Sequence, residues 1–254
     1  MLKEKKIKVC FIGNPNVGKS TLINRLLNSN VLQTSEHPGT TKSIIEKKLI
    51  WNEKEFTFLD TAGVYKKKDF NFNLLVKATR FSDIIILILD SSIDKLDKIH
   101  KKLAAHTLKS GKGLIIIFNK WDLIQNKKNK KNKLEKLIKN SLPQFDETKL
   151  IYISALRDTK FLRIFKYSIE IKKLLKSKMT TSNLNKWLRD IIRLKPPIRI
   201  KGKEIKFKYI VQTDTNPPTF KIFSNYPNKI NSSYKRFLEK KLKLNYKIDN
   251  IPVF

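Results

Sequence analysis

The string GNPNVGKS, residues 13–20, constrains the fold of this chain more than any other feature. It follows the apolar run 7–12, which is typical of a strand, and it precedes a segment with helical periodicity. Glycines at both ends let the chain curl until successive backbone N–H groups point inward at phosphate oxygens. In this context the string predicts a phosphate-binding loop that opens a helix.

Each position of this loop has a chemical role. Lys19 is expected to reach the terminal phosphates of a nucleotide, and the Ser20 hydroxyl is expected to bind Mg²⁺. The N-terminus of the following helix adds a partial positive charge. The predicted nucleotide-contacting residues here are Gly13, Asn14, Asn16, Val17, Gly18, Lys19, Ser20 and Thr21.

The remainder of the first two thirds alternates between short β-branched runs and helical segments, which predicts an α/β fold with a mainly parallel sheet flanked by helices. The expected strands are 7–12, 43–50, 55–59, 84–90, 114–119 and 150–153. Residues 51–54 are typical of a hairpin turn, so the second and third strands are expected to pair antiparallel at a sheet edge. The Lys- and Asn-rich run 125–133 is interpreted as a solvated loop.

Two further segments are expected to complete the phosphate and metal site. Asp60, in the string DTAG at the end of a strand, is predicted to bind Mg²⁺ through water, and the Gly63 N–H to sense the γ-phosphate. The polar stretch 28–42 ends in Thr40 and Thr41, and a threonine hydroxyl there can complete the magnesium coordination only when the γ-phosphate is present. We favour Thr41, although the spacing alone does not separate the two.

The string NKWD, residues 119–122, predicts which base is bound. The Asp122 carboxylate can accept two hydrogen bonds from guanine, and adenine offers no such donor pair. The Lys120 stem is expected to lie along the purine, and the turn 154–156 to offer backbone N–H groups to the guanine oxygen. The predicted base-contacting residues are Asn119, Lys120, Asp122, Ser154, Ala155 and Leu156.

Charge and composition narrow the cellular setting. The formal charge of +33 favours a polyanionic partner, but only eight of the 55 basic residues are arginines, which an AT-rich genome would also produce, so both explanations stay open. The single cysteine, Cys10, lies in a strand and is expected to pack in the core. Without a secretory segment or a long apolar run, we expect a cytoplasmic, soluble monomer.

The alternation stops near residue 178, and a different order follows. Helix 183–194, strands 205–213 and 219–224, and helix 232–244 predict a small α+β domain with a possible last strand at the chain end. We therefore expect a nucleotide-binding domain over 1–178 and a second domain over 182–254.

Taken together, these strings resemble the Der (EngA) family of GTPases, and specifically its second GTPase domain and its C-terminal KH-like domain. The resemblance rests on GNPNVGKS, PGTT, DTAG, NKWD and SAL, and in the tail on 208–210, 216–220 and 233–239. It implies a P-loop NTPase fold, GTP or GDP with Mg²⁺, and a role in assembly of the large ribosomal subunit with ribosomal RNA as partner. The family's first GTPase domain has no counterpart in this sequence, and Lys42-Ser43 replaces the family's usual Arg-Asp.

The expected reaction is slow GTP hydrolysis with Lys19, Thr41 and Gly63 in catalytic roles. Val64 follows the string DTAG and cannot orient a water, and Asn16 matches the position that holds a potassium ion in families with a hydrophobic residue there. Two alternatives stay open. One is a nucleotide-controlled ribosome-binding module with negligible catalysis; the other is an Era-like GTPase, against which the absence of a GXXG loop counts.

Overall fold

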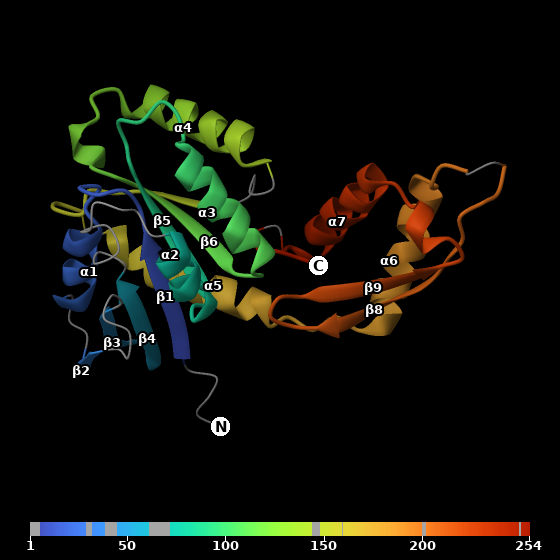
Figure 1. Cartoon of the computed structure of the whole chain (residues 1–254), viewed down its shortest axis with the longest axis horizontal. Helices are drawn as coiled ribbons and strands as arrows, with labels where there is room; N and C mark the ends of the chain where they lie inside the picture. Colours follow the sequence, from blue (N-terminus) through green and yellow to red (C-terminus); the bar gives the residue numbers. More distant parts are fainter. Residues whose placement is uncertain are drawn as a thin grey trace. The chain divides into compact units, whose positions relative to one another are not determined.

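A computed structural model describes residues 6–28, 32–38, 45–60, 72–143, 148–158, 160–199, 202–248 and 250–254 (Figure 1). The chain divides into two compact units, residues 1–172 and 173–254, and each is described here by itself.

The first unit is built on a seven-stranded sheet in the order β2-β3-β4-β1-β5-β6-β7. β1 pairs parallel with β4 and β5, and β5, β6 and β7 continue in parallel, which confirms the predicted mainly parallel α/β fold. The strands are β1 (Lys6–Ile12), β2 (Leu32–Pro38), β3 (Ile45–Trp51), β4 (Lys54–Asp60), β5 (Ile84–Asp90), β6 (Gly113–Asn119) and β7 (Lys149–Tyr152). The helices are α1 (Lys19–Asn28), α2 (Phe72–Arg80), α3 (Lys98–Lys109), α4 (Lys127–Ser141) and α5 (Arg163–Leu175), with short 3-10 turns η3 (Trp121–Leu123) and η5 (Lys160–Leu162).

The hairpin predicted between the second and third expected strands is present, but it does not form the sheet edge. Asn52 and Glu53 both have positive φ, which suits a two-residue turn, and β3 and β4 pair antiparallel. The edge is β2, which lies in the polar stretch 28–42, where we predicted no strand, and it pairs antiparallel with β3. An edge strand needs no continuous apolar run, so its sequence gave no strand signal.

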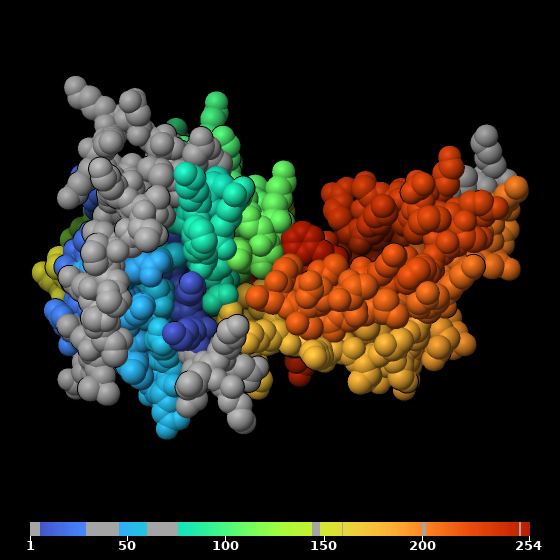
Figure 2. Space-filling model, turned by 60° about the horizontal axis from the view of Figure 1, so that its bottom comes forward, coloured from blue at the N-terminus to red at the C-terminus, as the bar shows by residue number. Residues whose placement is uncertain are grey.

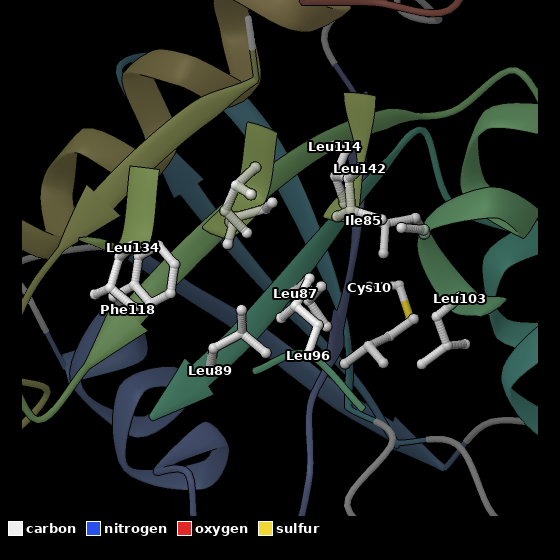
Figure 3. Packing of buried hydrophobic residues seen from close by; sticks show 14 of the residues in the cluster. Cys10, Ile85, Leu87, Leu89, Leu96, Leu103, Leu114, Phe118, Leu134 and Leu142 are labelled. Atoms are coloured by element: carbon white, nitrogen blue, oxygen red, sulfur yellow. The ribbon is translucent and has the colours of Figure 1, made fainter. Parts of the chain in front are cut away.

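The two faces of the sheet have different cores. On one face the aliphatic side chains of β1, β5 and β6 pack against α2, α3 and α4, and Figure 3 shows Cys10 and Leu103 of α3 in this cluster. Cys10 is fully buried, as predicted. On the other face an aromatic group forms part of the core: Phe165 of α5 stacks on Trp51 and Phe58 and meets Phe56 edge-on.

The interpretation of residues 125–133 as a loop is wrong, because α4 begins at Lys127. Asn126 caps the helix by accepting a hydrogen bond from the Asn129 N–H, and Leu134 and Ile138, one turn apart, anchor it in the core. Lysine is a good helix former once such an anchor exists.

The second unit packs α6 (Thr181–Leu194) and α7 (Ser232–Tyr246) with a two-stranded antiparallel sheet of β8 (Phe207–Asp214) and β9 (Thr219–Ser224); the short turn η6 (Pro227–Lys229) precedes α7. Its core includes Trp187, Ile210 and Leu238. In place of a last strand, the Phe254 backbone exchanges hydrogen bonds with Pro218 and Phe220. Figure 2 shows the orange atoms of β8 and β9 on the surface of this unit.

Along the ranges that the structure describes, no helix combines the length and the apolar character needed to cross a membrane.

Candidate nucleotide-binding site

The predicted phosphate-binding loop connects β1 to α1 and depends on two glycines for its shape. Gly18 has φ +91°, a conformation that L side chains rarely adopt, and a Cβ atom there would collide with the Asn119 amide. At Gly13 a Cβ atom would collide with the Ile88 carbonyl oxygen of β5. The loop can therefore lie close to the neighbouring strands only because both residues lack a side chain.

Lys19 is the first residue of α1, and its ammonium points back into the loop. The Nζ atom donates hydrogen bonds of 2.8 Å each to the carbonyl oxygens of Gly13 and Asn14, and the residue is only 6% exposed. A buried ammonium requires such partners. The arrangement holds a positive charge inside the loop, while Ser20, the next residue, is exposed at the helix N-terminus.

Asn119, the last residue of β6, joins the phosphate loop to a turn after β7. Its Nδ2 atom donates to the Val17 carbonyl at 2.7 Å, and its Oδ1 atom accepts from the Ala155 N–H at 2.8 Å. Asn119 is 2% exposed, so neither hydrogen bond competes with bulk water. A buried side chain that satisfies both partners fixes the distance between the two loops. From the sequence we had expected Asn119 only to contact the base.

Lys120 begins the turn that presents Asp122. Its backbone is left-handed, with φ 61° and ψ 34°, and its Nζ atom forms an ion pair of 2.8 Å with Asp90 at the end of β5. Partial burial raises the pKa of Asp90, but hydrogen bonds from Lys120 and Ser92 outweigh it and leave the pKa below its ordinary value. The Lys120 stem is thus held at one end by a carboxylate.

The turn after β7 uses part of the hydrogen-bonding capacity that we expected it to offer to a base. The Ser154 N–H donates to Asp158 at 2.9 Å, and the Ala155 N–H donates to Asn119. A guanine oxygen would therefore compete with Asn119 for the Ala155 N–H. Leu156 is exposed in this turn.

The Asp122 carboxylate has a partner that the sequence did not suggest. The Nε atom of Arg157 lies 3.8 Å from Oδ2 of Asp122, and the side chains are 79% and 18% exposed respectively. Arg157 directly follows the predicted turn 154–156, and this position was the only available signal. An exposed ion pair of this length is weak and easily exchanged for another partner.

Asp97, the N-cap residue of α3, supports the phosphate loop from outside. Its Oδ2 atom accepts a hydrogen bond of 3.1 Å from the Asn14 side chain and lies 3.9 Å from Nδ1 of His100. His100 is 3% exposed, and within the described ranges neither ring nitrogen has a hydrogen-bond partner. Burial lowers the pKa of His100 and the nearby Asp97 carboxylate opposes this only in part. Nothing in the spacing of these residues predicted the contact.

The metal and switch residues are only partly described. Asp60 ends β4 in register with Phe11 of β1, so its backbone lies at the same end of the sheet as the phosphate loop. Thr40, Thr41 and Gly63 lie outside the described residues.

A glycine loop between the first strand and helix, a turn after β6 that carries Asp122 and a second turn after β7 form the framework of a P-loop GTPase domain. A family model described as "50S ribosome-binding GTPase" matches residues 8–120, and one described as "KH-domain-like of EngA bacterial GTPase enzymes, C-terminal" matches residues 178–254. The chain belongs to the Der (EngA) family of GTPases.

Relatives named GTPase Der agree with this assignment. The protein of Mycoplasma mycoides subsp. mycoides is 34% identical and that of Rickettsia akari 32% identical; each alignment covers 99% of this chain. This chain spans 59% and 58% of the lengths of those two relatives.

Solved structures support the fold. Era from Aquifex aeolicus, as a variant bound to GDP.AlF4-, has a TM-score of 0.52 at 22% identity, over 98% of this chain and 91% of that chain. Era in complex with MgGDPNP and a segment of 16S ribosomal RNA has a TM-score of 0.50 at 22% identity, with the same two coverages. At this identity the likeness concerns the fold alone.

Proposed function

We propose that this chain binds GTP and hydrolyses it slowly to GDP and phosphate. The observation that carries the proposal is the Asn119 side chain, which joins Val17 of the phosphate loop to Ala155 of the base-facing turn. A nucleotide has its phosphates and its base at a fixed separation, and a buried tie between the loops for the two ends suits such a ligand.

The base is proposed to be guanine, selected by Asp122. Its carboxylate can accept from the N1–H and the exocyclic amine of guanine once Arg157, its exposed partner, moves aside. Adenine would leave the carboxylate without donors while covering it from water, and an acceptor that loses water without gaining a partner is costly. Gly13, Asn14, Gly18 and the amides of the loop are proposed to surround the phosphates.

Mg²⁺ is the expected metal, and the donor set fits it. Ser20 is exposed at the start of α1, and the backbone of Asp60 ends the strand beside β1, so the two residues belong to elements that meet at one end of the sheet. A hydroxyl and a carboxylate are oxygen ligands of the kind that Mg²⁺ prefers. When bound, Mg²⁺ would neutralise charge on the phosphates. Thr41, favoured over Thr40, is proposed as a further ligand.

Hydrolysis is proposed to depend on charge neutralisation by Lys19 and the loop amides, with the Gly63 N–H as a further donor to the γ-phosphate. The Val64 side chain offers no group that could orient the attacking water, so we expect slow turnover. Asn16 has φ 62° and is exposed on the loop, which suits a ligand of a potassium ion beside the phosphates. Faster phosphate release in potassium than in sodium would support this role, and equal rates would exclude it.

The biological role proposed is assembly of the large ribosomal subunit in the cytoplasm, with ribosomal RNA as partner. The family supports it, and so does the charge of +33. We propose domain limits of 1–178 and 182–254, which the end of α5 at Leu175 and the start of α6 at Thr181 support.

The test is multiple-turnover phosphate release from GTP and ATP, with and without large ribosomal subunits. We expect phosphate to be released from GTP and not from ATP, and the large ribosomal subunits to increase the rate. Lys19→Ala should abolish phosphate release from GTP. Nucleotide binding without turnover in any condition would favour a nucleotide-controlled binding module. Preference for ATP would contradict the proposal.

A further inference from the structure

The first unit has a basic hollow at the edge of the sheet that β7 forms. It is separate from the nucleotide loops described above. The hollow lies between α4, β7 and the start of α5, and its volume is about 740 Å³. We call it the α4–β7 groove. Among the described residues, the basic side chains that line it are Lys131, Lys136, Lys139, Lys149, Lys160 and Arg163, and the acidic one is Glu135.

These cations come from three elements that are distant in sequence. α4 contributes the first three, β7 contributes Lys149, and Lys160 and Arg163 come from η5 and α5. Lys131, Lys136 and Lys139 of α4 line the groove, whereas Lys127 and Lys128 at the start of the same helix do not. Like charges repel each other, so lysines that are only solvated have no reason to gather in one hollow. Their convergence on the groove therefore favours an anionic ligand.

Aromatic rings lie among these cations. Trp121 and Tyr152 line the groove with ring centroids 4.7 Å apart, and the Lys131 ammonium lies 5.9 Å from the centre of the Tyr152 ring. Phe118 stacks behind Tyr152 at 5.4 Å, which fixes the ring in place. Burial, and then the nearby Glu135 carboxylate, raise the pKa of Tyr152, so its hydroxyl stays neutral and adds no negative charge to the groove.

We propose that the α4–β7 groove binds a single-stranded segment of RNA, with its lysines on the phosphodiester backbone and its aromatic side on the bases. The proposal rests on the proposed RNA partner and assigns a surface to it. Grooves that bind single strands combine a positive track with aromatic stacking platforms. An acidic peptide would use the cations, but RNA carries a planar base beside every phosphate of its backbone, so the combination favours RNA.

The groove is also connected to the nucleotide site through adjacent residues. Trp121, on its aromatic side, directly precedes Asp122 in η3, and its backbone N–H donates to the Ile153 carbonyl at 3.0 Å. Ile153 precedes the base-facing turn that begins at Ser154. RNA on this surface would therefore contact the elements that present the guanine-selecting carboxylate.

The test compares two double variants of α4 that remove the same charge. Lys136→Gln with Lys139→Gln changes the groove, and Lys127→Gln with Lys128→Gln is the matched control outside it. Binding of a fluorescent single-stranded RNA oligonucleotide is measured by anisotropy across a salt series. We expect the groove variant to bind more weakly and to lower the slope of log K against log salt by about 1.4, since each phosphate contact contributes roughly 0.7 for single strands. The control should keep the wild-type slope.

Three outcomes would overturn the proposal. Equal losses in the two variants would mean that the lysines act by overall charge alone, and unchanged binding in the groove variant would place the RNA elsewhere. If polyglutamate displaced the fluorescent RNA as well as unlabelled RNA does, the groove would be a general anion-binding surface. If the unmodified chain binds no RNA at all, the proposed RNA partner fails as well, so the two failures are distinguishable. GTP binding, unchanged in both variants, serves as the control for folding.

Photochemical cross-linking locates the bound strand independently. An RNA oligonucleotide containing 4-thiouridine should cross-link to Trp121 or Tyr152, as mapped by mass spectrometry, if bases stack on the aromatic side. Cross-links confined to the second unit would contradict the proposal.

Discussion

The proposed phosphate end of the nucleotide site is shaped mainly by its backbone, whereas the proposed guanine end is held by side chains. At the phosphate end, two glycines make the close approach possible and two carbonyl oxygens bind the Lys19 ammonium. At the guanine end, Lys120 pairs with Asp90 and Asp122 pairs with Arg157. The difference suggests that the phosphate end tolerates almost no added atoms, while the guanine end can change its specificity by exchanging single polar groups.

The largest effect is expected at the guanine end. Asp122→Asn replaces an acceptor by an amide that places a donor against the donors of guanine, and it removes two hydrogen bonds to a charged group, each of about 1.5–3 kcal/mol. We expect GTP affinity to fall by about 1,000-fold, with binding of xanthosine triphosphate retained, because xanthine has an acceptor in place of the amine. Calorimetry with both nucleotides measures this. Asp94→Asn, at an 87% exposed side chain, is the control, and an unchanged GTP affinity in Asp122→Asn would disprove the assigned role.

The second effect tests the role of the backbone at the phosphate end. Gly18→Ala introduces strain of about 1–3 kcal/mol and pushes the Asn119 amide away from Val17. We expect about a 100-fold loss of GTP affinity, measured by displacement of a fluorescent nucleotide. Gly202→Ala is the matched control, since Gly202 also has positive φ, at +76°, but has no atom within 4 Å of its Cβ position. Equal losses of GTP affinity from the two substitutions would show that the effect does not depend on the contact with Asn119.

Mild acidification should act on His100, which lies beside Asp97, the residue that holds Asn14 of the phosphate loop. Burial lowers the pKa of His100, so the folded state holds this ring neutral, and the unfolded chain takes up its proton near pH 6.5. The contribution of the neutral His100 ring to the free energy of unfolding is therefore fully present above pH 6.5. It falls as the pH drops toward the lowered pKa, by at most about 1.4 kcal/mol per pH unit. We expect His100→Leu to reduce the pH dependence of Tm between neutral and mildly acidic solution.

The lowered pKa of Asp90, by contrast, preserves the Lys120 ion pair until the pH falls below the ordinary carboxyl range. His106 is the comparison for His100, because partial burial and then Arg80 and Lys109 also lower its pKa. If His106→Leu removed the whole pH dependence of Tm and His100→Leu removed none of it, the assignment of this pH dependence to His100 would be wrong.

The smallest effect is expected from the ion pair at the guanine end. Arg157→Ala removes a competitor for the Asp122 carboxylate, and exposed pairs of this kind contribute about 0.2–1 kcal/mol. GTP affinity should rise by up to about fivefold, mainly at low salt, as measured by calorimetry at two ionic strengths. A marked fall in affinity would indicate instead that Arg157 contacts the bound nucleotide.

Several parts of the fold were accessible from the sequence because their signals are local. A strand, a glycine loop and a helix in succession indicated the phosphate loop, and the apolar runs of β1, β5 and β6 indicated a parallel sheet. The edge strand β2 and the start of α4 were not accessible. Both consist of polar residues, whose conformation is fixed by one neighbouring strand or by a few buried anchors such as Leu134.

The sequence by itself determined that glycines 13 and 18 and Lys19 form a phosphate loop, because that geometry depends on residue type over a few consecutive positions. Only the tertiary structure decided that Asn119 ties this loop to Ala155, that Asp97 supports Asn14 and that Arg157 pairs with Asp122. These contacts join loops that the parallel sheet brings to one end, and the distance between such loops is set by strand order and register. A side chain's partner across the sheet is therefore a property of the packed molecule and not of the neighbouring sequence.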